Sequence, residues 1–460
     1  MAEWEPVAYL VLAWTQYPNI LRDVVQAAKP ECKIIIVCRD SNWVKSDLSQ
    51  HNISSRGIYY LQTNFNSAWI RDYGPLSTYI GPDQRLALVE WKYNRPRPFD
   101  DAVPWAIGKF LDLPVESLQD ASFPVIHTGG NFMTDGWGTA FSSDLLISEN
   151  LLSNPEIDPE AAERGIDASL KEFMGIHRNI KFPSLQYDRI HHLDMHMKLL
   201  DEETILVGQF PSGVADEPQI EANLEWLARN HHSVFGQPYQ VVRIPMPDEQ
   251  DIYPDRPGIP YRTYTNALIL NRSVLVPTYQ NEMDSLALEI WQDLMPGYRI
   301  VGIDCSQAIL AGGALHCLTQ TIGAENPLAF LHRPKRGTTL DSIGYSIRAL
   351  IRHPAGIESA SVWVAYGDSE TYSKLEMKRD RNAEGYWHGV IPDIPGIHDV
   401  RYFLEIKPVG IPAQTRPLPG PSGAWRFHIS RLNASDREGA NDQIELMGER
   451  FSLILPAIPR

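Results

Sequence analysis

The chain has 460 residues and a mass of 52.0 kDa, and 43% of its residues are hydrophobic and 21% charged. This composition is typical of a soluble globular protein and excludes disordered or collagen-like chains, while the length is enough for about three domains of ~150 residues. Fifty-seven acidic against 41 basic residues give a net charge of −16, which argues against a nucleic-acid partner bound through a basic face.

The longest strongly apolar run, residues 6–14, is far shorter than the roughly 18 residues that a membrane-spanning helix needs. It follows Glu3 and Glu5 rather than Lys or Arg, so it does not resemble a secretory signal. We therefore expect a cytoplasmic protein without a membrane partner. The sequence does not define the oligomeric state.

Short β-rich runs alternate with helical patterns up to about residue 350, which predicts an α/β domain. Runs rich in β-branched and aromatic residues predict strands at Ala8–Trp14, Lys33–Arg39, Arg85–Trp91, Thr204–Phe210, Tyr239–Pro245 and Leu268–Pro277. Apolar residues at spacings of three and four predict helices at Leu21–Ala28, Ala161–Phe173, Ile220–His231 and Asp284–Met295.

The pattern changes near residue 355, where short alternating strands replace the mixed elements. Ser361–Tyr366 and Val400–Ile406 alternate apolar and polar residues, with turn signals between them. About 75 residues of this kind predict a small immunoglobulin-like β-sandwich, although the Cys-Trp-Cys pattern is absent. Pro408 to Gly423 is expected to be a loop. The expected domains are residues 1–354, 355–432 and a C-terminal extension, 433–460, whose apolar end at 451–458 we expect to pack onto a core.

Four short stretches combine glycine or proline with a reactive side chain. In the first, residues 69–75 (WIRDYGP), a Trp and an Asp before a Gly-Pro turn could hold a carboxylate beside an aromatic wall. Alternatively, Asp72 is buried against turn amides or pairs with Arg71. In the second, residues 127–131 (HTGGN), paired glycines allow the backbone to approach another group closely, or simply form a tight turn.

The third stretch, residues 191–196 (HHLDMH), gathers three histidines around one aspartate. A metal site is one interpretation. The alternative is that His192, Asp194 and His196 share one face of a strand without any metal. A His and a carboxylate two residues apart also suit general acid–base chemistry, which would leave His191 and His196 as ordinary core histidines.

The fourth stretch, residues 311–320 (AGGALHCLTQ), places Cys317 directly after a glycine-rich turn. Loop amides and a nearby imidazolium would favour the thiolate that a nucleophile needs. Alternatively, Cys317 is a small buried apolar residue. Four cysteines are too few for a disulfide framework, and none has CxxC spacing; the others are Cys32, Cys38 and Cys305.

Together these stretches resemble the bacterial-type peptidylarginine deiminase and agmatine deiminase group of guanidine-modifying enzymes. That group carries a Trp-x-Arg-Asp-x-Gly-Pro turn, a Gly-Gly-Asn turn, a His-x-Asp pair and a glycine-rich turn ending in His-Cys. All four occur here in the same order, and the resemblance extends from about residue 3 to 325. The sequence departs at residues 311–314 (AGGA), where a longer glycine run is common in the group.

The resemblance implies a five-bladed, pseudosymmetric α/β propeller of ββαβ units with a central active site. The spacing of the marked residues agrees with one such unit for each, although no repeat is visible in the letters. The separations are 59, 63, 72 and 51 residues along the series Asp72, Asn131, Asp194, Asn266 and Cys317.

The resemblance also implies hydrolysis of the guanidinium of arginine to citrulline and ammonia. Asp72 and Asp194 would hold the planar cation through charge-assisted hydrogen bonds. Cys317 would attack the central carbon, and His192 would act first as acid and then as base. Asn266 would help to orient the thiol region. This chemistry requires no metal or organic cofactor; structural calcium or sodium is a separate question that the sequence does not answer.

Substrate choice is expected to depend on Trp69, as an aromatic wall along the substrate, and on a fifth stretch, residues 93–98 (YNRPRP). From the residues alone, Arg95 and Arg97 are better explained by pairing with nearby aspartates in a solvated loop. The peptidylarginine deiminase branch, however, carries a similar Arg-Pro-Arg segment that binds the carboxylate of a C-terminal arginine. Agmatine deiminases typically lack that segment and the β-sandwich, so the resemblance favours arginine in peptides or proteins.

Two alternatives remain. One is a deiminase of free small guanidines, agmatine or arginine. The other belongs to a different class: an inactive, deiminase-like binding module. The presence of Asp72, His192, Asp194 and Cys317 removes the usual sign of inactivity.

Overall fold

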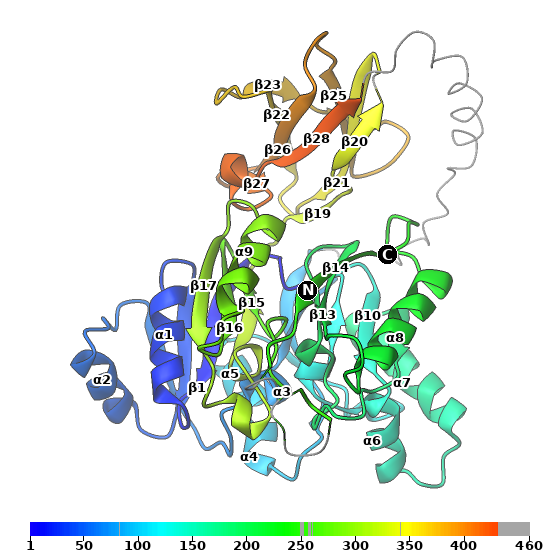
Figure 1. Ribbon diagram of the computed structural model, residues 1–460. Helices are drawn as coiled ribbons and strands as arrows, with labels where there is room; N and C mark the ends of the chain where they lie inside the picture. The colour runs from blue at the N-terminus through cyan, green and yellow to red at the C-terminus, as the bar shows by residue number, and fades with distance from the viewer. Residues whose placement is uncertain (82, 249–252, 256–258, 260, 341, 431–460) are drawn as a thin grey trace. The chain divides into compact units, whose positions relative to one another are not determined.

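The computed structural model describes residues 1–81, 83–248, 253–255, 259, 261–340 and 342–430. The chain forms two compact units (Figure 1). The first consists of the described residues within Met1–Leu294 and Arg299–Glu325, and the second of Met295–Tyr298 and the described residues from Asn326 to Ser430. The main division therefore falls after Glu325 and not near residue 355, because the strands that follow it pair within the second unit.

Within the described residues of the first unit, five sheets repeat one strand pattern: an antiparallel pair whose second strand also pairs in parallel with a third. The sheets are β18–β1–β2–β3 (Gln320–Gly323, Val7–Ala13, Lys33–Cys38, Ile58–Gln62), β4–β5–β7 (Leu76–Ile80, Arg85–Glu90, Val115–Ser117), β9–β10–β11 (Met133–Thr134, Thr139–Ser143, Arg178–Phe182), β12–β13–β14 (Met197–Leu199, Thr204–Gln209, Gln240–Pro245) and β15–β16–β17 (Leu268–Leu270, Ser273–Thr278, Arg299–Asp304). The short strands β6 (Lys92–Tyr93) and β8 (Ile126–His127) pair with each other.

Helices connect the parallel strands, as crossover connections require. Figure 1 shows α1 and α2 on one side of this unit and α6, α7 and α8 on the other. These alternating elements confirm the predicted α/β fold. The helices are α1 (Pro18–Ala28), α2 (Ser41–Gln50), α4 (Pro98–Asp101), α5 (Val103–Leu111), α6 (Leu145–Ser153), α7 (Pro159–Met174), α8 (Glu217–Asn230) and α9 (Asp284–Leu294).

A short segment leads into the first strand of each sheet. Four of these segments are single helical turns: α3 (Ile70–Tyr73) before β4, η1 (Gly129–Asn131) before β9, η2 (Leu193–Met195) before β12 and η4 (His316–Leu318) before β18. The fifth, around Asn266, leads into β15. Turn α3 contacts both η1 and η4, and η1 contacts η2. The repeated pattern thus brings distant parts of the sequence to one place.

The second unit contains two sheets that share an apolar core. Val362 and Val364 of one sheet and Ile347 and Trp387 of the other belong to the same buried cluster, which is the arrangement of a β-sandwich. The sheets are β19–β21–β25–β24 (Ala329–His332, Gly344–Arg352, Tyr386–Pro392, Lys378–Arg379) and β20–β28–β26–β22–β23 (Gly337–Leu340, Trp425–Ser430, Asp399–Pro408, Ile357–Tyr366, Ser373–Glu376), with β27 (Gln414–Arg416) beside β26.

The structure corrects three local predictions. The strand expected at Leu268–Pro277 is a hairpin, because Asn271 adopts a positive φ of 51° and turns the chain between β15 and β16. The stretch 191–196 contains a helical turn, η2 (Leu193–Met195), rather than a strand. The loop expected between Pro408 and Gly423 contains β27 and a helical turn, η5 (Gly420–Gly423). The apolar end at 451–458 lies outside the described residues.

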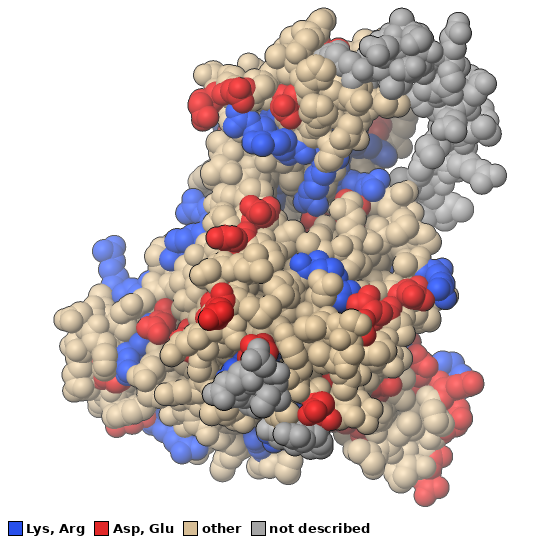
Figure 2. All heavy atoms as spheres, in the orientation of Figure 1, with Lys and Arg blue, Asp and Glu red and all other residues tan. Residues whose placement is uncertain are grey.

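The surface is acidic over part of the first unit. Figure 2 shows acidic side chains at the lower right, over α6 and α7; those of α7 are Glu160, Glu163, Asp167 and Glu172. This distribution agrees with the net charge of −16. Among the described residues, no helix combines the length and the apolar character needed to cross a bilayer.

The α9 helix supports the segment around Asn266 through Trp291, which is fully buried and donates from Nε1 to the carbonyl oxygen of Tyr264 at 3.1 Å. We predict that Trp291→Ala lowers the free energy of unfolding by about 3–5 kcal/mol, since it removes a large buried side chain and one hydrogen bond. Denaturant unfolding checks this value. Trp43→Ala is the control, because Trp43 is 51% exposed and its loss should change stability by only about 0.5 kcal/mol. Equal effects would contradict the assignment.

Candidate active site

The segments that lead into the sheets gather five of the residues singled out from the sequence. Asp72 comes from α3, His192 and Asp194 from η2 and its flank, Asn266 from the segment before β15, and Cys317 from η4. All five are buried, with exposed fractions between 0% for Asp194 and 7% for Asp72. The structure therefore brings together a thiol, an imidazole, an amide and two carboxylates that are far apart in the sequence.

Asp72 faces His192 rather than its neighbour Arg71. The distance between Asp72 Oδ1 and His192 Nδ1 is 3.6 Å. Arg71 donates instead from Nη1 to Gln320 Oε1 at 2.8 Å and from Nε to the His316 carbonyl oxygen at 3.4 Å. The alternative in which Asp72 simply pairs with Arg71 is thus not what the structure contains.

Cys317 lies between Asp194 and Asn266. Its Sγ is 4.0 Å from Asp194 Oδ2 and 3.5 Å from Asn266 Nδ2. Asn266 is held in turn by the His316 amide, which donates to Asn266 Oδ1 at 2.9 Å. The Asn266 side chain therefore contacts both the backbone of η4 and the Cys317 thiol that η4 carries.

The backbone of η1 closes the site on one side. A Cβ added to Gly130 would lie 2.5 Å from His192 Nδ1, 3.0 Å from Asp72 Oδ1 and 3.2 Å from Asp194 Oδ2. The glycine pair found in the sequence is therefore required for close approach, because any side chain here would collide with three polar groups of the site.

Several polar atoms at the site form no hydrogen bond with the described residues. They are Asp72 Oδ1, Asp194 Oδ1 and both ring nitrogens of His192. Buried polar atoms in native proteins are almost always hydrogen-bonded. A set of unpaired acceptors beside a thiol therefore indicates a binding site for a small molecule that carries several N–H donors.

Burial sets the protonation of the reactive groups. It raises the pKa of the Cys317 thiol well above its usual value, and the Asp194 and Asp72 carboxylates raise it further. Burial also raises the pKa of Asp72 and lowers that of His192. The ring of the adjacent His316 contacts Asp194 at 2.7 Å and Glu3 at 3.1 Å, so the imidazole next to Cys317 in the sequence faces carboxylates.

Arg95 lies near the site and Arg97 lies farther along the same segment. Burial is the largest influence on the pKa of Asp72 and of His192, raising the first and lowering the second. The positive charge of Arg95 is a smaller influence that lowers both pKa values. Its Nη1 is 3.7 Å from Glu149 Oε1. Arg97 donates to the Tyr93 hydroxyl at 3.5 Å.

The simpler explanation of the two arginines, pairing with Asp100 and Asp101, does not match the structure. Asp100 accepts from the backbone amides of Asn66 and Ser67. Asp101 accepts from Lys92 and from the Tyr93 amide.

Trp69 packs against the glycine-rich turn that precedes Cys317. A Cβ at Gly313 would lie 2.5 Å from Trp69 Cζ3, and the Tyr17 ring centroid lies 5.9 Å from that of Trp69. The indole is thus held by the turn and by an aromatic neighbour. Its contact with the turn that precedes Cys317 places it at the site.

The histidine-rich stretch is used for two different purposes. His192 joins the site, whereas His191 contacts the Leu185 carbonyl oxygen at 2.8 Å through Nδ1. His196 is buried, which lowers its pKa to about 4. In the described portion of the chain, no group of three or more His, Cys, Asp or Glu side chains is arranged to hold a metal ion.

Sequence reasoning missed residues that support the site from behind. In the sequence, Glu3 stands out only as a charge before an apolar run, and Glu149 does not stand out. Glu149 accepts from Asn94 at 2.8 Å with each of its oxygens, which fixes the segment carrying Arg95. Neither residue lies in a recognisable motif, so no local signal could have identified them.

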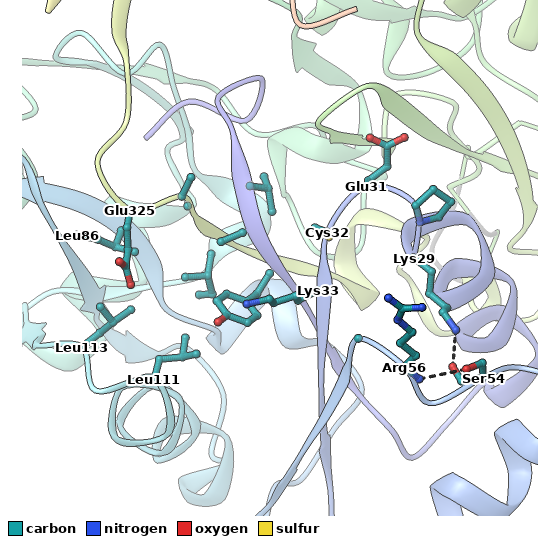
Figure 3. Close-up of a pocket in the computed structure, with 18 residues that line it drawn as sticks. Lys29, Glu31, Cys32, Lys33, Ser54, Arg56, Leu86, Leu111, Leu113 and Glu325 are labelled. Atoms are coloured by element: carbon teal, nitrogen blue, oxygen red, sulfur yellow. Dashed lines mark hydrogen bonds between the residues drawn. The ribbon is translucent and has the colours of Figure 1, made fainter. Parts of the chain in front are cut away.

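A cavity of about 790 Å³ lies elsewhere in the first unit. Figure 3 shows Lys29 and Arg56 beside Ser54 on one side of it and Leu111 and Leu113 on the other. The described residues that line it include none of the five gathered at the site. This cavity therefore does not coincide with the polar contacts that define the candidate site.

Comparison with known proteins agrees with this geometry. The profile of the Porphyromonas-type peptidyl-arginine deiminase family matches residues 1–322. The chain belongs to this family. The agmatine deiminase of Pseudomonas syringae pv. tomato is 25% identical over 354 residues, which cover 69% of this chain and 94% of that protein.

Solved structures show the same fold at lower identity. An agmatine deiminase of Enterococcus faecalis is 21% identical with a TM-score of 0.59, covering 70% of this chain and 94% of its own. The C. jejuni agmatine deiminase is 22% identical with a TM-score of 0.57, covering 70% and 95%. The family match ends at residue 322, close to the end of the first unit at Glu325, so the second unit is an addition to the matched region.

The pKa of Cys317 leads to a prediction for alkylation by iodoacetamide. Because the pKa is raised, the rate at Cys317 should still increase with pH above pH 9, as only the thiolate reacts. Asp72→Asn removes a carboxylate that raises this pKa, so it should lower the pKa and increase the rate at pH 8, by roughly tenfold for each unit of pKa. Peptide mass spectrometry separates Cys317 from the other cysteines.

The control for this experiment is Asp135→Asn. Asp135 is also buried in the first unit, but it binds the backbone amides of Trp137 and Thr139. It should leave the rate at Cys317 unchanged. A wild-type rate that is already constant from pH 7 upward would contradict a raised pKa.

Proposed function

We propose that this protein is a deiminase that hydrolyses the guanidinium group of arginine in peptides or proteins, preferably a C-terminal arginine, to citrulline and ammonia. The observation that supports the proposal most strongly is the pair of buried carboxylates, Asp72 and Asp194, with unpaired oxygens beside Cys317 and His192. Membership of the deiminase family supports the reaction type.

A guanidinium fits this site for electrostatic and geometric reasons. It is planar, it is cationic at any physiological pH, and it presents several N–H donors in a fixed arrangement. Asp72 and Asp194 would accept these donors, and charge-assisted hydrogen bonds are stronger where water is excluded. Two carboxylates from different turns would fix the plane of the cation and direct its central carbon toward the thiol.

Substrate binding would also generate the nucleophile. Asp194 and Asp72 raise the pKa of Cys317 after burial has already done so. A cation bound between these carboxylates offsets their charge and favours the thiolate. At neutral pH the thiolate would then form mainly when substrate is bound.

The reaction would proceed in two halves. The Cys317 thiol transfers its proton to His192, and the resulting thiolate attacks the central carbon to form an S–C bond. His192 passes that proton to one nitrogen, and the C–N bond breaks to release ammonia and leave a thiouronium. His192 then takes a proton from water, which attacks the same carbon. The C–S bond breaks, giving the ureido product and the free thiol. Asn266 would hold the sulfur during both halves.

We propose that the five sheets of the first unit are the blades of a propeller around this site, and that the second unit is an immunoglobulin-like support. The repeated strand pattern and the position of each site residue before a sheet support the first proposal. The shared core of two sheets supports the second. Neither unit requires a cofactor for the proposed chemistry.

Specificity for a C-terminal arginine would come from Arg95 and Arg97, which could bind the substrate carboxylate. The closeness of Arg95 to Asp72 and His192 supports a role at the site. The second candidate function is deimination of agmatine, which has no carboxylate. It is favoured by the relatives, several of which are named agmatine deiminases. An inactive binding module is less well supported, because Cys317, His192, Asp194 and Asp72 all meet at one place.

Arginine substitutions separate the two substrates. We predict that Arg95→Ala lowers kcat/KM roughly ten- to a hundredfold for a peptide ending in arginine, since it removes a charge-assisted hydrogen bond, and leaves agmatine turnover unchanged. Arg97→Ala should act in the same direction. Citrulline and ammonia assays with both substrates check this, with Arg164→Ala on exposed α7 as the control.

The outcomes of this experiment distinguish the proposals. Equal losses for both substrates would contradict the carboxylate contact. Turnover of agmatine alone by the wild type would favour the second candidate. No turnover of either substrate by the wild type, with the Cys317→Ala variant indistinguishable from it, would contradict deiminase function.

Gly130 provides a further prediction. A methyl group at this position would lie 2.5 Å from His192 Nδ1 and 3.0 Å from Asp72 Oδ1, so Gly130→Ala should lower kcat/KM at least about a hundredfold through misplaced catalytic groups. Gly57→Ala is the control, because nothing lies within 4 Å of a Cβ there. Because Gly57 has a positive φ of 79°, Gly57→Ala should lower stability but leave kcat/KM unchanged. Full activity of Gly130→Ala would show that the backbone of η1 does not border the reacting groups.

A further inference from the structure

A series of alternating charges lies behind the two carboxylates, and its members are buried except Glu3, whose side chain is 18% exposed. Asp194 Oδ2 is 2.7 Å from His316 Nδ1, and His316 Nε2 is 3.1 Å from Glu3 Oε2. The same Glu3 oxygen accepts from Lys198 Nζ at 2.5 Å. Asp194, His316 and Lys198 are 0%, 2% and 1% exposed. The series thus runs from the site to a residue 313 positions away from His316 in the sequence.

The contacts of His316 define what its ring does. An ionised carboxylate only accepts hydrogen bonds, and both ring nitrogens face carboxylate oxygens. Burial alone would raise the pKa of Glu3, but Lys198 and His316 outweigh it and lower that pKa, so Glu3 is ionised. A ring that donates from both nitrogens is an imidazolium. The two contacts together favour a cationic ring between Asp194 and Glu3.

Glu3 is held firmly enough to fix this ring. Its second oxygen, Oε1, accepts from the backbone amide of Ile269 at 3.0 Å. Lys198, the residue that binds Oε2, also donates to the Ala267 carbonyl oxygen at 2.7 Å. Glu3 is thereby tied to β12 and β15 as well as to η4. A side chain with this many partners can determine the position of His316 and not merely follow it.

We propose that Glu3 is a positioning residue for the guanidinium-binding carboxylate: through His316 it keeps Asp194 oriented, with Oδ2 occupied and Oδ1 left for the substrate. This assignment rests on the proposed deiminase function. The reason is electrostatic, since two carboxylates buried near each other tend to protonate unless a cation stabilises them. Neither Glu3 nor His316 needs to contact the substrate.

The test compares two alkylating reagents of similar size at Cys317. Chloroacetamidine carries a planar amidinium cation that the carboxylates should hold, whereas iodoacetamide is neutral. The rate with chloroacetamidine divided by the rate with iodoacetamide should be higher for Cys317 in the wild type than for a free thiol such as glutathione. We call this ratio, relative to glutathione, the preference for the cationic reagent. Glu3→Gln keeps the shape of the side chain and removes its charge. It should lower the wild-type preference roughly tenfold or more, with the iodoacetamide rate little changed.

Two further variants separate positioning from anchoring of the chain. Glu5→Gln is the matched control, because Glu5 lies in the same segment and accepts from the Ala2 amide at 2.7 Å but does not contact His316. It should keep the wild-type preference. His316→Gln can donate one hydrogen bond to Asp194 but carries no charge, so it should lose the preference as Glu3→Gln does. Melting temperatures of all variants report any general loss of structure.

Each outcome supports or overturns the assignment. A reduced preference in Glu3→Gln and His316→Gln, with Glu5→Gln unchanged, supports positioning. A wild-type preference that survives in Glu3→Gln overturns positioning and leaves the proposed function intact. Equal reductions in Glu3→Gln and Glu5→Gln, with equal losses of melting temperature, overturn it in favour of simple anchoring. A wild type without any preference overturns both proposals, because the carboxylates would then not recognise the cation.

Discussion

The constraint on which the site depends is the burial of two carboxylates, Asp72 and Asp194, next to a cysteine thiol. Removing a carboxylate from water is unfavourable by several kcal/mol unless charged or hydrogen-bonding partners compensate. Burial accordingly raises the pKa of Asp72 and of Cys317. The protein places positive charge around this region, with Arg71 and Lys198 fully enclosed. Two ionised carboxylates in this site are therefore stable only when positive charge, from the protein or from a bound cation, lies beside them.

The fold meets this constraint with short turns rather than with long elements. Each of the five sheets is preceded by a segment that ends near the same place. A turn of three or four residues can direct one side chain inward while its neighbour points elsewhere, as Asp72 and Arg71 do. Gly130 and Gly313 then let the backbone approach where a side chain would collide. The precision of the site comes from these turns, and the sheets supply the rigidity.

Much of the fold and the central residues could be predicted from the sequence, but not the contacts that support them. Strand and helix patterns located elements such as α8 and β2 because their periodicity is local. Resemblance to a family identified Cys317, His192, Asp194 and Asp72, which spacing alone would not have joined. The hairpin at Asn271 was missed because its turn depends on one positive φ. Glu3 was missed because its partner lies 313 residues away, and no local pattern encodes such a contact.

The most direct test of the account is to trap the covalent intermediate. The wild type would be mixed with a peptide ending in arginine and, separately, with agmatine. Each reaction would be quenched in acid within a fraction of a turnover and analysed by peptide mass spectrometry. The account predicts an adduct on Cys317 whose mass is that of the substrate less one ammonia, absent in Cys317→Ala. Product formation without any adduct, or an adduct confined to Cys32, Cys38 or Cys305, would contradict it.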